Sequence, residues 1–422
     1  MSNDVVIIGG GPAGSAVSLF LQQAGIRSTI VEKDPFPRYH IGESMTGECG
    51  NCIASLGLRD EMIRKGHPVK WGTAVYGPSG SVPFYVPVRA RSPEGNLVDA
   101  STWQVRRSQF DSMLLDTAIS RGADFVNGEA IAPIVRGGAV TGVKVRTASG
   151  SVAQIDAPLV IDASGQRTFL ARAGVTGPKD RGAYDNQVAI FSQVSGAVRE
   201  TGRTKDDTLI FYQKKHHWAW WIPLDDDTVS VGVVVPKEYF TEKNESRRDF
   251  LARELRELNP GLSARLPEIR FTEEVRAISN YSYQVANFTG QGFLCIGDAH
   301  RFIDPVFSFG LFFAIKEAEL ASAAVSAWFN GANRDRPRPF AEFESVSTRG
   351  MNAIQDLIDA FWSQPIPFSV FVHSRYVDDC VDLFAGRVYP DEPSPGLLAF
   401  RKLNRRVTES TRDIARLSSL ST

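Results

Sequence analysis

Cysteine is scarce in this sequence, with four among 422 residues. A chain of this length with four thiols does not carry the dense disulfide framework of small secreted domains. Cys49 and Cys52 form a C-x-x-C pair, but no second pair follows that would complete a zinc site, and Cys295 and Cys380 stand alone. We expect four ordinary thiols in a reducing compartment and no metal site. Redox or metal use of the C-x-x-C pair is the alternative.

Strong charge and long apolar runs are also lacking. The net charge is −1, which gives no electrostatic reason to expect nucleic acid or a membrane surface as a partner. No apolar run reaches the 18 residues of a transmembrane helix; the best candidate, 311–328, is broken by Lys316, Glu317 and Glu319. The N-terminus leads past Asp4 directly into an apolar strand, without the basic segment of a signal peptide. A soluble, cytoplasmic protein is expected.

The composition is that of an ordinary globular protein: 43% of the residues are hydrophobic and 23% are charged. At 422 residues the chain is long enough for more than one hydrophobic core, so two or three interleaved lobes are expected. Aromatic residues make up 10% of the sequence, which weakly favours a protein that encloses a flat ligand.

Two kinds of strand pattern predict the fold. Apolar runs at 4–8, 28–31, 158–161 and 292–296 are typical of buried parallel strands, and the first two flank a helix at 15–24 in a β-α-β unit. From 184 to 283 the pattern changes to alternating strands of an antiparallel sheet. We predict an α/β fold with an FAD-binding, Rossmann-like βαβ domain interleaved with an antiparallel substrate domain. The FAD-binding domain would comprise 1–75, 103–180 and 286–330, the substrate domain 76–102 and 181–285, and a helical C-terminal region 331–422.

A dinucleotide fingerprint follows the first strand. Gly9-x-Gly11-x-x-Gly14, with Pro12 and Ala13 inside it, lies between a strand and a helix, where such glycines allow a tight turn and a close approach of the pyrophosphate. The pyrophosphate is expected at the helix N-terminus, whose unpaired amides and dipole favour an anion. Glu32, with Lys33 after it, ends the second strand and is placed to accept the ribose hydroxyls. The fingerprint alone does not separate NAD from FAD.

Three further segments favour FAD. Gly297-Asp298 ends a buried strand, and Asp162-Ala-Ser-Gly165 and Arg106-Arg107-Ser-x-Phe110-Asp111 accompany it along the chain. Together they resemble the p-hydroxybenzoate-hydroxylase-like flavoprotein superfamily over most of residues 1–330. The resemblance implies that Asp298 binds the ribityl or pyrophosphate part of FAD. No second G-x-G-x-x-G occurs, so no separate NAD(P)H domain is encoded.

Three local motifs resemble the flavin-dependent halogenases more than the hydroxylases. Lys70 lies in Pro-Val-Lys-Trp-Gly, where halogenases keep their essential lysine. Trp218-x-Trp220-x-Ile-Pro matches their tryptophan motif, whose first two indoles share one face of a strand. Phe302-x-x-Pro305-x-x-Ser308-x-Gly310 matches their segment beside the flavin, and Gly42-Glu43-Ser44 also resembles their G-E-S stretch. Taken alone, the tryptophans would suit a strand of a large core, and Lys70 would be a solvated strand lysine.

The resemblance implies an FADH2-dependent reaction with O2 and chloride or bromide. A flavin hydroperoxide would oxidise the halide, and Lys70 would hold the resulting hypohalous acid or become a haloamine. The halide needs backbone donors, for which the amides of Phe309 and Gly310 are the candidates. The expected catalytic residues are Lys70, Ser308, Trp218 and Trp220. The expected cofactor-binding residues are Gly9, Gly11, Pro12, Ala13, Gly14, Glu32, Lys33, Gly42, Glu43, Ser44, Arg106, Asp162, Gly297, Asp298, Pro305 and Gly310.

The sequence departs from the tryptophan halogenases in two ways. Phe307 stands where those enzymes carry a Glu that engages the indole, and the Asp-Pro-Val-Phe-Ser form resembles the branch that acts on phenols, pyrroles or carrier-bound substrates. Phe309 replaces a small residue next to the expected halide site. The implied partners are a flavin reductase that supplies FADH2, and an electron-rich aromatic substrate, free or bound to an acyl or peptidyl carrier protein.

Two other functions stay open at this point. One is an FAD-dependent aromatic monooxygenase or oxidase, and the other is a flavoprotein without catalysis. The basic residues Arg401, Lys402, Arg405 and Arg406 are spaced to share one side of a helix, either as a solvated face or as a docking patch for an acidic carrier. His216 and His217 are adjacent strand residues that face opposite ways and are not expected to bind one metal.

Overall fold

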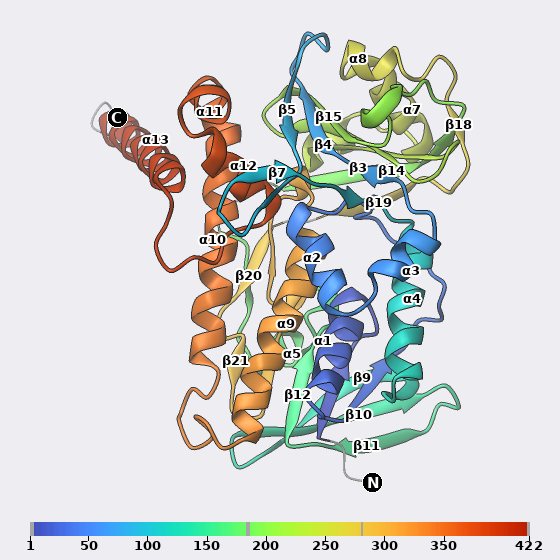
Figure 1. The fold of residues 1–422 in the computed structure, drawn as a ribbon, viewed down its shortest axis with the longest axis vertical. Coiled ribbons are helices and arrows are strands. Elements are labelled where there is room, and N and C mark those ends of the chain that lie inside the picture. Colours follow the sequence, from blue (N-terminus) through green and yellow to red (C-terminus); the bar gives the residue numbers. More distant parts are fainter. Residues whose placement is uncertain (1–3, 183–185, 280–281, 420–422) are drawn as a thin grey trace. The chain divides into compact units, whose positions relative to one another are not determined.

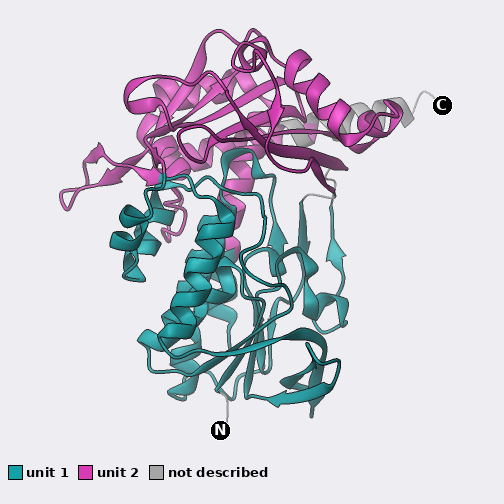
Figure 2. Cartoon of the chain, turned by 90° about the vertical axis from the view of Figure 1, so that its right-hand side faces the viewer, with its two compact units in different colours: residues 1–67, 103–185, 281–347 teal, residues 68–102, 186–280, 348–422 magenta. Residues whose placement is uncertain are grey.

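The computed structural model of the chain describes residues 4–182, 186–279 and 282–419 (Figure 1). The chain forms two compact units, each assembled from three segments (Figure 2). Unit 1 comprises Met1–His67, Trp103–Asp185 and Tyr281–Ser347. Unit 2 comprises Pro68–Thr102, Asn186–Asn280 and Thr348–Thr422.

Unit 1 is built around an eight-stranded sheet in the order β11-β10-β9-β2-β1-β12-β22-β21. Its central strands are parallel and lie at β1 (Val5–Ile8), β2 (Ser28–Glu32), β12 (Leu159–Asp162) and β22 (Phe293–Cys295). These are the four apolar runs that predicted parallel strands, and the first three are buried along their whole length. The outer strands are β9 (Asp124–Arg136), β10 (Ala139–Thr147), β11 (Val152–Asp156) and β21 (Thr289–Gly290).

Three helices of unit 1 pack together around α1 (Pro12–Gln23). Helix α1 connects β1 to β2 and packs against α9 (Gly310–Phe329) and α4 (Arg107–Ser120). The remaining elements are α2 (Gly47–Ser55), α3 (Arg59–Arg64), α5 (Phe169–Arg172), and a small sheet of β13 (Lys179–Asp180), β20 (Tyr283–Val285) and β23 (Arg301–Phe302). The nucleotide fingerprint lies in the turn between β1 and α1, as the sequence predicted.

Unit 2 contains a largely antiparallel sheet in the order β18-β14-β17-β16-β15-β4-β5, with β19 paired to β14. Strands β4 and β15 are parallel to each other. The strands are β4 (Gly72–Tyr76), β5 (Pro83–Pro87), β14 (Gln187–Ser195), β15 (Thr208–Lys214), β16 (His217–Pro223), β17 (Val229–Pro236), β18 (Arg270–Phe271) and β19 (Arg276–Ser279). Strand β3 (Val69–Lys70) precedes β4, β6 (Arg89–Arg91) and β7 (Leu97–Asp99) form a hairpin, and β8 is Thr102–Trp103.

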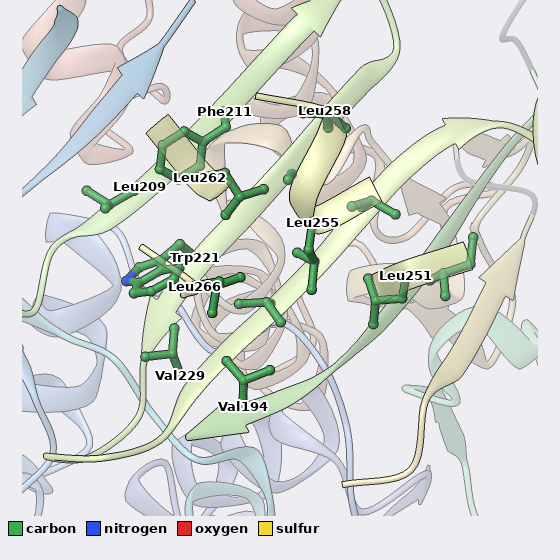
Figure 3. Packing of buried hydrophobic residues seen from close by; sticks show 14 of the residues in the cluster. Val194, Leu209, Phe211, Trp221, Val229, Leu251, Leu255, Leu258, Leu262 and Leu266 are labelled. Carbon is green, nitrogen blue, oxygen red and sulfur yellow. The ribbon is translucent and has the colours of Figure 1, made fainter. Parts of the chain in front are cut away.

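One face of this sheet forms the core of unit 2. Trp221 of β16 and Phe211 of β15 pack with leucines of α7 (Arg247–Glu257) and α8 (Pro260–Ser263), as Figure 3 shows. Trp221 is 1% exposed, and removing a side chain of this size from water contributes about 2–3 kcal/mol. Together with α6 (Lys237–Glu242), these helices interrupt a region for which the sequence predicted strands alone.

The expected division of the chain differs from the observed units at several boundaries, including 181–185 and 281–285, which were expected in the substrate domain and belong to unit 1. Residues 68–75, expected in the FAD-binding domain, belong to unit 2, because β4 hydrogen-bonds to β15. The C-terminal region from 331 is helical in its described part, as predicted, and it is divided between unit 1 (331–347) and unit 2 (348–422). The helices there are α10 (Ala341–Ser363), α11 (Pro365–Val370), α12 (Val377–Ala385) and α13 (Pro395–Ser419), with a π-helical turn at Phe371–Arg375.

Candidate active site

The glycine turn between β1 and α1 is held so tightly that side chains are excluded from it. Gly9 has a φ of +105°, and a Cβ added there would lie 2.5 Å from the carbonyl oxygen of Ala163. A Cβ on Gly14 would lie 1.9 Å from the carbonyl oxygen of Gly9. Pro12 is the first residue of α1, where its missing amide costs nothing, and Gly11 is the N-cap. The first turn of α1 thus offers unpaired amides and a positive helix end to a pyrophosphate.

Glu32 fixes this turn from the end of β2. Its Oε2 accepts a hydrogen bond from the Gly10 amide, and its Oε1 accepts from the amides of Lys33 and Asp34, each at 2.8 Å. A carboxylate has about four acceptor positions, so these bonds leave capacity for a ribose hydroxyl. Lys33 itself is exposed and its ammonium lies 3.6 Å from the Asp34 carboxylate.

The Gly42–Ser44 stretch is anchored by Arg107, which sequence reasoning did not select. The Arg107 guanidinium pairs with the Asp111 carboxylate at 2.7 and 2.9 Å and donates to the Ile41 carbonyl at 2.6 Å. The Gly42 amide donates to the Glu43 carboxylate at 2.9 Å. Arg106, the predicted residue, is the half-buried N-cap of α4. In the sequence, only the i, i+4 spacing of Arg107 and Asp111 indicated that these two side chains would pair.

Asp162 serves the loop that borders the glycine turn. Its carboxylate accepts hydrogen bonds from the amides of Ser164 and Leu170 at 3.0 and 2.7 Å. The side chain is fully buried, and the loss of hydration raises its pKa. Since Ala163 is the residue against which Gly9 packs, Asp162 shapes the nucleotide turn through the backbone.

The Gly297–Asp298 turn rests on a buried carboxylate from α9. Glu317 accepts hydrogen bonds from the Gly297 amide at 2.6 Å, from His300 Nε2 at 3.0 Å, and from the Ser347 hydroxyl. The Tyr283 hydroxyl donates to the Asp298 carbonyl at 2.5 Å. Loss of hydration raises the pKa of the Asp298 carboxyl to about 7, with Arg107 lowering it and Glu317 raising it further. Glu317 and Tyr283 were not selected from the sequence, because their partners lie far along the chain.

The Pro305–Gly310 segment forms an amide-lined turn at the start of α9. Asp304 Oδ1 accepts from the Val306 amide at 3.1 Å, and the Ser308 amide donates to the Pro305 carbonyl at 2.9 Å. Ser308 is left-handed (φ +63°) and Phe309 is right-handed (φ −83°), a succession that turns neighbouring amides toward one concave side. The Phe309 ring packs with Phe312 and Phe313 of the same helix, with centroids 6.4 and 6.0 Å away.

In unit 2, Trp218 and Trp220 lie on the sheet face opposite to the Trp221 core. Their ring centroids are 6.1 Å apart, and both side chains are buried. Trp220 Nε1 donates to the Ser230 hydroxyl at 3.1 Å. Among the described residues, the buried Trp218 Nε1 has no hydrogen-bond acceptor, so this donor is available to a ligand. Tyr212 lies opposite Trp218 on β15, and Phe361 of α10 packs on Tyr212 with centroids 5.6 Å apart.

Lys70 ends β3 and is 3% exposed, whereas Val69 before it is 37% exposed. This burial differs from that of a solvated strand lysine. Lys70, Trp218 and Trp220 belong to unit 2, and the predicted nucleotide and halide residues belong to unit 1.

The two histidines before the tryptophan motif have different neighbours. His216 Nδ1 lies 3.2 Å from Gln187 Nε2, and the His217 ring packs on Tyr239. Both were expected on a strand, but only His217 belongs to β16, and His216 lies in the preceding turn with a φ of +57°. The four cysteines are buried thiols that form no disulfide with one another. Within residues 4–182, 186–279 and 282–419, no group of three His, Cys, Asp or Glu side chains is arranged to hold a metal. None of the described helices has the length and hydropathy needed to cross a membrane.

The unit 1 site defines the class of protein. Two glycines that exclude side chains, a helix N-terminus, Glu32 fixed beside them and the Asp298 turn fit an adenine dinucleotide and its ribityl chain. The family model described as an FAD binding domain matches residues 2–336. The protein is an FAD-binding flavoprotein.

Similar proteins give the family. A brominase of 1H-pyrrole-2-carbonyl on a peptidyl-carrier protein, from Pseudoalteromonas luteoviolacea, is 37% identical over 386 residues, which are 91% of this chain and 92% of that protein. The corresponding chlorinase from Pseudomonas fluorescens is 31% identical over 416 residues, 92% of this chain and 89% of that protein. A solved flavin-dependent brominase superposes with a TM-score of 0.90 at 35% identity, covering 98% of this chain and 100% of the other. The chain therefore belongs to the flavin-dependent halogenases, and it is an enzyme.

Proposed function

We propose that this halogenase modifies a pyrrole-2-carbonyl group bound to a peptidyl carrier protein. This substrate is supported by the similarity, over nearly the full length of the chain, to two enzymes named for it, one a brominase and one a chlorinase. Phe307, in the place where tryptophan halogenases carry a Glu, supports the same substrate class. Bromide and chloride are both candidate halides.

FAD would be held by the unit 1 residues that fit it, and reduced FAD with O2 supplies the oxidising power that makes the halide electrophilic. A separate flavin reductase would provide the reduced cofactor, because the chain contains one dinucleotide fingerprint. In the balanced reaction, the aromatic carbon loses a proton and gains the halogen, and O2 is reduced to two waters with electrons from FADH2 and halide.

The halide would bind at the amides of Phe309 and Gly310. These amides lie in the first turn of a 20-residue helix, and the αL–αR succession at Ser308 and Phe309 turns them toward one side. A helix N-terminus favours a monovalent anion without a fixed cation, so the halide stays reactive.

Lys70 would hold the oxidised halogen, either by hydrogen bonding to hypohalous acid or as a haloamine. Its burial supports this role, because it keeps the side chain, and a halogen bound to it, apart from bulk water. Trp218 and Trp220 would form a rigid wall beside it, and the Trp218 indole N–H would be a donor for the substrate. Ser308 would keep the halide turn in its left-handed conformation.

The test is a product assay with purified protein, a flavin reductase, NADH and bromide. The carrier protein loaded with pyrrole-2-carbonyl, free pyrrole-2-carboxylate and a simple phenol are offered in parallel. We expect the bromine isotope pattern on the carrier-bound pyrrole, lost when bromide or the reductase is omitted. Oxygen insertion without halide dependence would instead identify a monooxygenase, and peroxide release without any product would identify a flavoprotein that does not turn over these substrates.

A further inference from the structure

The backbone directly after Lys70 is held by one buried carboxylate. Asp207 Oδ1 accepts hydrogen bonds from the Trp71 amide at 2.6 Å and the Gly72 amide at 2.9 Å. Its Oδ2 accepts from the Tyr85 hydroxyl at 2.8 Å. Asp207 is 2% exposed, so water does not compete for these bonds. Two successive peptide amides are thus fixed by one side chain that comes from 135 residues further along the chain.

The sheet register explains why Asp207 reaches these amides. It immediately precedes β15, and Thr208, the first residue of β15, pairs with Thr73 of β4. Asp207 therefore lies beside Gly72, where β4 begins, and its short side chain bonds the amides of the approach to that strand. In a sheet, the amides of Trp71 and Gly72 would donate to carbonyls of a neighbouring strand; here they donate to the Asp207 carboxylate instead.

Tyr85 of β5 is the other side chain in contact with Asp207 and Gly72. Its ring crosses Gly72 so closely that a Cβ there would lie 2.3 Å from the ring and hydroxyl. Burial and the bond to Asp207 raise the pKa of Tyr85, so the phenol remains a donor at neutral pH. Glycine at 72 is required for this arrangement.

Trp71 is also fixed through its carbonyl and its ring. Its carbonyl accepts from the Val88 amide at 2.7 Å. The Arg203 guanidinium lies 3.6 Å from the centre of its indole and pairs with Asp99 at 2.9 Å. With the next residue held at its N–H, its C=O and its ring, the Lys70 Cα has a defined position.

We propose that Asp207 is a positioning residue for Lys70: by bonding the two amides that follow the lysine, it fixes the direction in which the lysine side chain leaves the backbone. This inference rests on the proposed role of Lys70 in halogen transfer. Asp207 acts through the backbone, so an uncharged acceptor of the same shape should replace it. That separates it from a simple counterion of Lys70, whose effect would require the charge.

Two substitutions separate geometry from charge. Asp207→Asn keeps an oxygen for the Trp71 and Gly72 amides but removes the charge, and Asp207→Ala removes both. Asp206→Asn is the matched control, because this neighbouring carboxylate pairs with Arg199 and its removal changes the net charge by the same amount. Hydrogen–deuterium exchange of the full chain, measured without flavin or substrate, reports on the amides directly. We expect exchange in the 70–76 segment to rise at least tenfold in Asp207→Ala and to stay near wild type in Asp207→Asn and Asp206→Asn.

Halogenated product per FADH2 consumed is the second measurement. We expect Asp207→Ala to lower this yield at least tenfold with FADH2 reoxidation unchanged, and Asp207→Asn to keep at least a third of it. Equal losses in the Asn and Ala variants would overturn positioning in favour of charge, and unchanged yield in Asp207→Ala would overturn it outright. If Asp207→Ala does not fold, Gly72→Ala displaces Tyr85 instead and should lower the yield with all charges intact; an unchanged yield there contradicts the proposal. Lys70→Ala, run alongside, tests the lysine itself: retained halogenation there is a failure of the proposed function, not of Asp207.

Discussion

The indole of Trp220 lies directly over Gly232 of the neighbouring strand. The two residues are cross-strand partners on β16 and β17, and a Cβ on Gly232 would lie 2.3 Å from Cζ2 and Cη2 of the ring. Phe191 borders the same space from β14, with its ring centroid 6.0 Å from that of Trp220. Gly232 thus gives the second tryptophan of the motif its place on the sheet.

Substitution of Gly232 by alanine is expected to displace the Trp220 ring. Overpacking of this kind costs about 1–3 kcal/mol of the free energy of unfolding. Thermal unfolding should show a melting temperature lower by several degrees, and the tryptophan emission should change. Gly77→Ala is the control, because a Cβ there would meet its nearest neighbour at 3.4 Å. Equal stability of Gly232→Ala and Gly77→Ala would contradict the described packing.

Asp298 should make the stability of the flavin-free protein depend on pH. Its folded-state pKa of about 7 is above the ordinary value of 3.8, so between these values the folded chain holds a proton that the unfolded chain has lost. The stability contribution of this proton is present at low pH and is lost as the pH rises through 7. Asp298→Asn lacks this dependence, so its melting temperature should gain on the wild type between pH 5 and pH 8. A constant difference across that range, with Asp60→Asn as an exposed control, would argue against the raised pKa.

The sequence predicted much of the fold because local patterns determine those parts. The apolar runs of β1, β2, β12 and β22 and the glycine fingerprint predicted the parallel sheet, and strands β14 to β17 matched their alternating patterns. The helices α6 to α8 were missed, since their apolar residues cover a sheet whose partners are fixed only by tertiary packing.

The site was predicted less completely for the same reason. Gly9, Gly14 and Glu32 lie within one β-α-β unit, so their spacing in the sequence was enough to propose them. Arg107 was not proposed beside Arg106, because the sequence does not say which of two adjacent arginines turns inward. Asp207 and Glu317 are fixed by partners that the fold brings to them, and no local motif marks either residue.

The origin of the reducing equivalents gives another prediction. With one dinucleotide fingerprint in the chain, the purified protein should not oxidise NADH at a useful rate by itself, and should turn over when a separate reductase supplies FADH2. NADH consumption followed at 340 nm, with and without the reductase, is the measurement. Efficient NADH turnover by the pure chain would place it with the one-component hydroxylases.

The basic face of α13 is expected to take part in carrier recognition. Of the four predicted cations, Lys402, Arg405 and Arg406 are exposed. Arg401 is partly buried and pairs with Asp356 at 2.8 Å. Complementary charge mainly accelerates encounter and is screened by salt. Arg405→Glu with Arg406→Glu should lower kcat/KM for a carrier-bound substrate about tenfold at low ionic strength and much less at high ionic strength.

The matched control for this patch reverses two exposed cations on other helices of unit 2. Lys237→Glu with Arg247→Glu changes the net charge by the same amount on α6 and α7. A small free substrate should be processed equally by all three proteins. If both double variants slow the carrier-bound substrate alike, net charge rather than the α13 face is responsible.

The central claim is that Lys70 holds the oxidised halogen, and Lys70→Ala tests it most directly. Halogenated product per FADH2 consumed should fall at least a hundredfold, while FAD affinity and the rate of FADH2 reoxidation stay near wild type, because an interaction made only during halogen transfer is lost. Lys70→Arg keeps the charge but cannot form a haloamine, so it shows whether hydrogen bonding alone suffices. Retention by Lys70→Ala of more than about a tenth of the wild-type product yield would contradict the account.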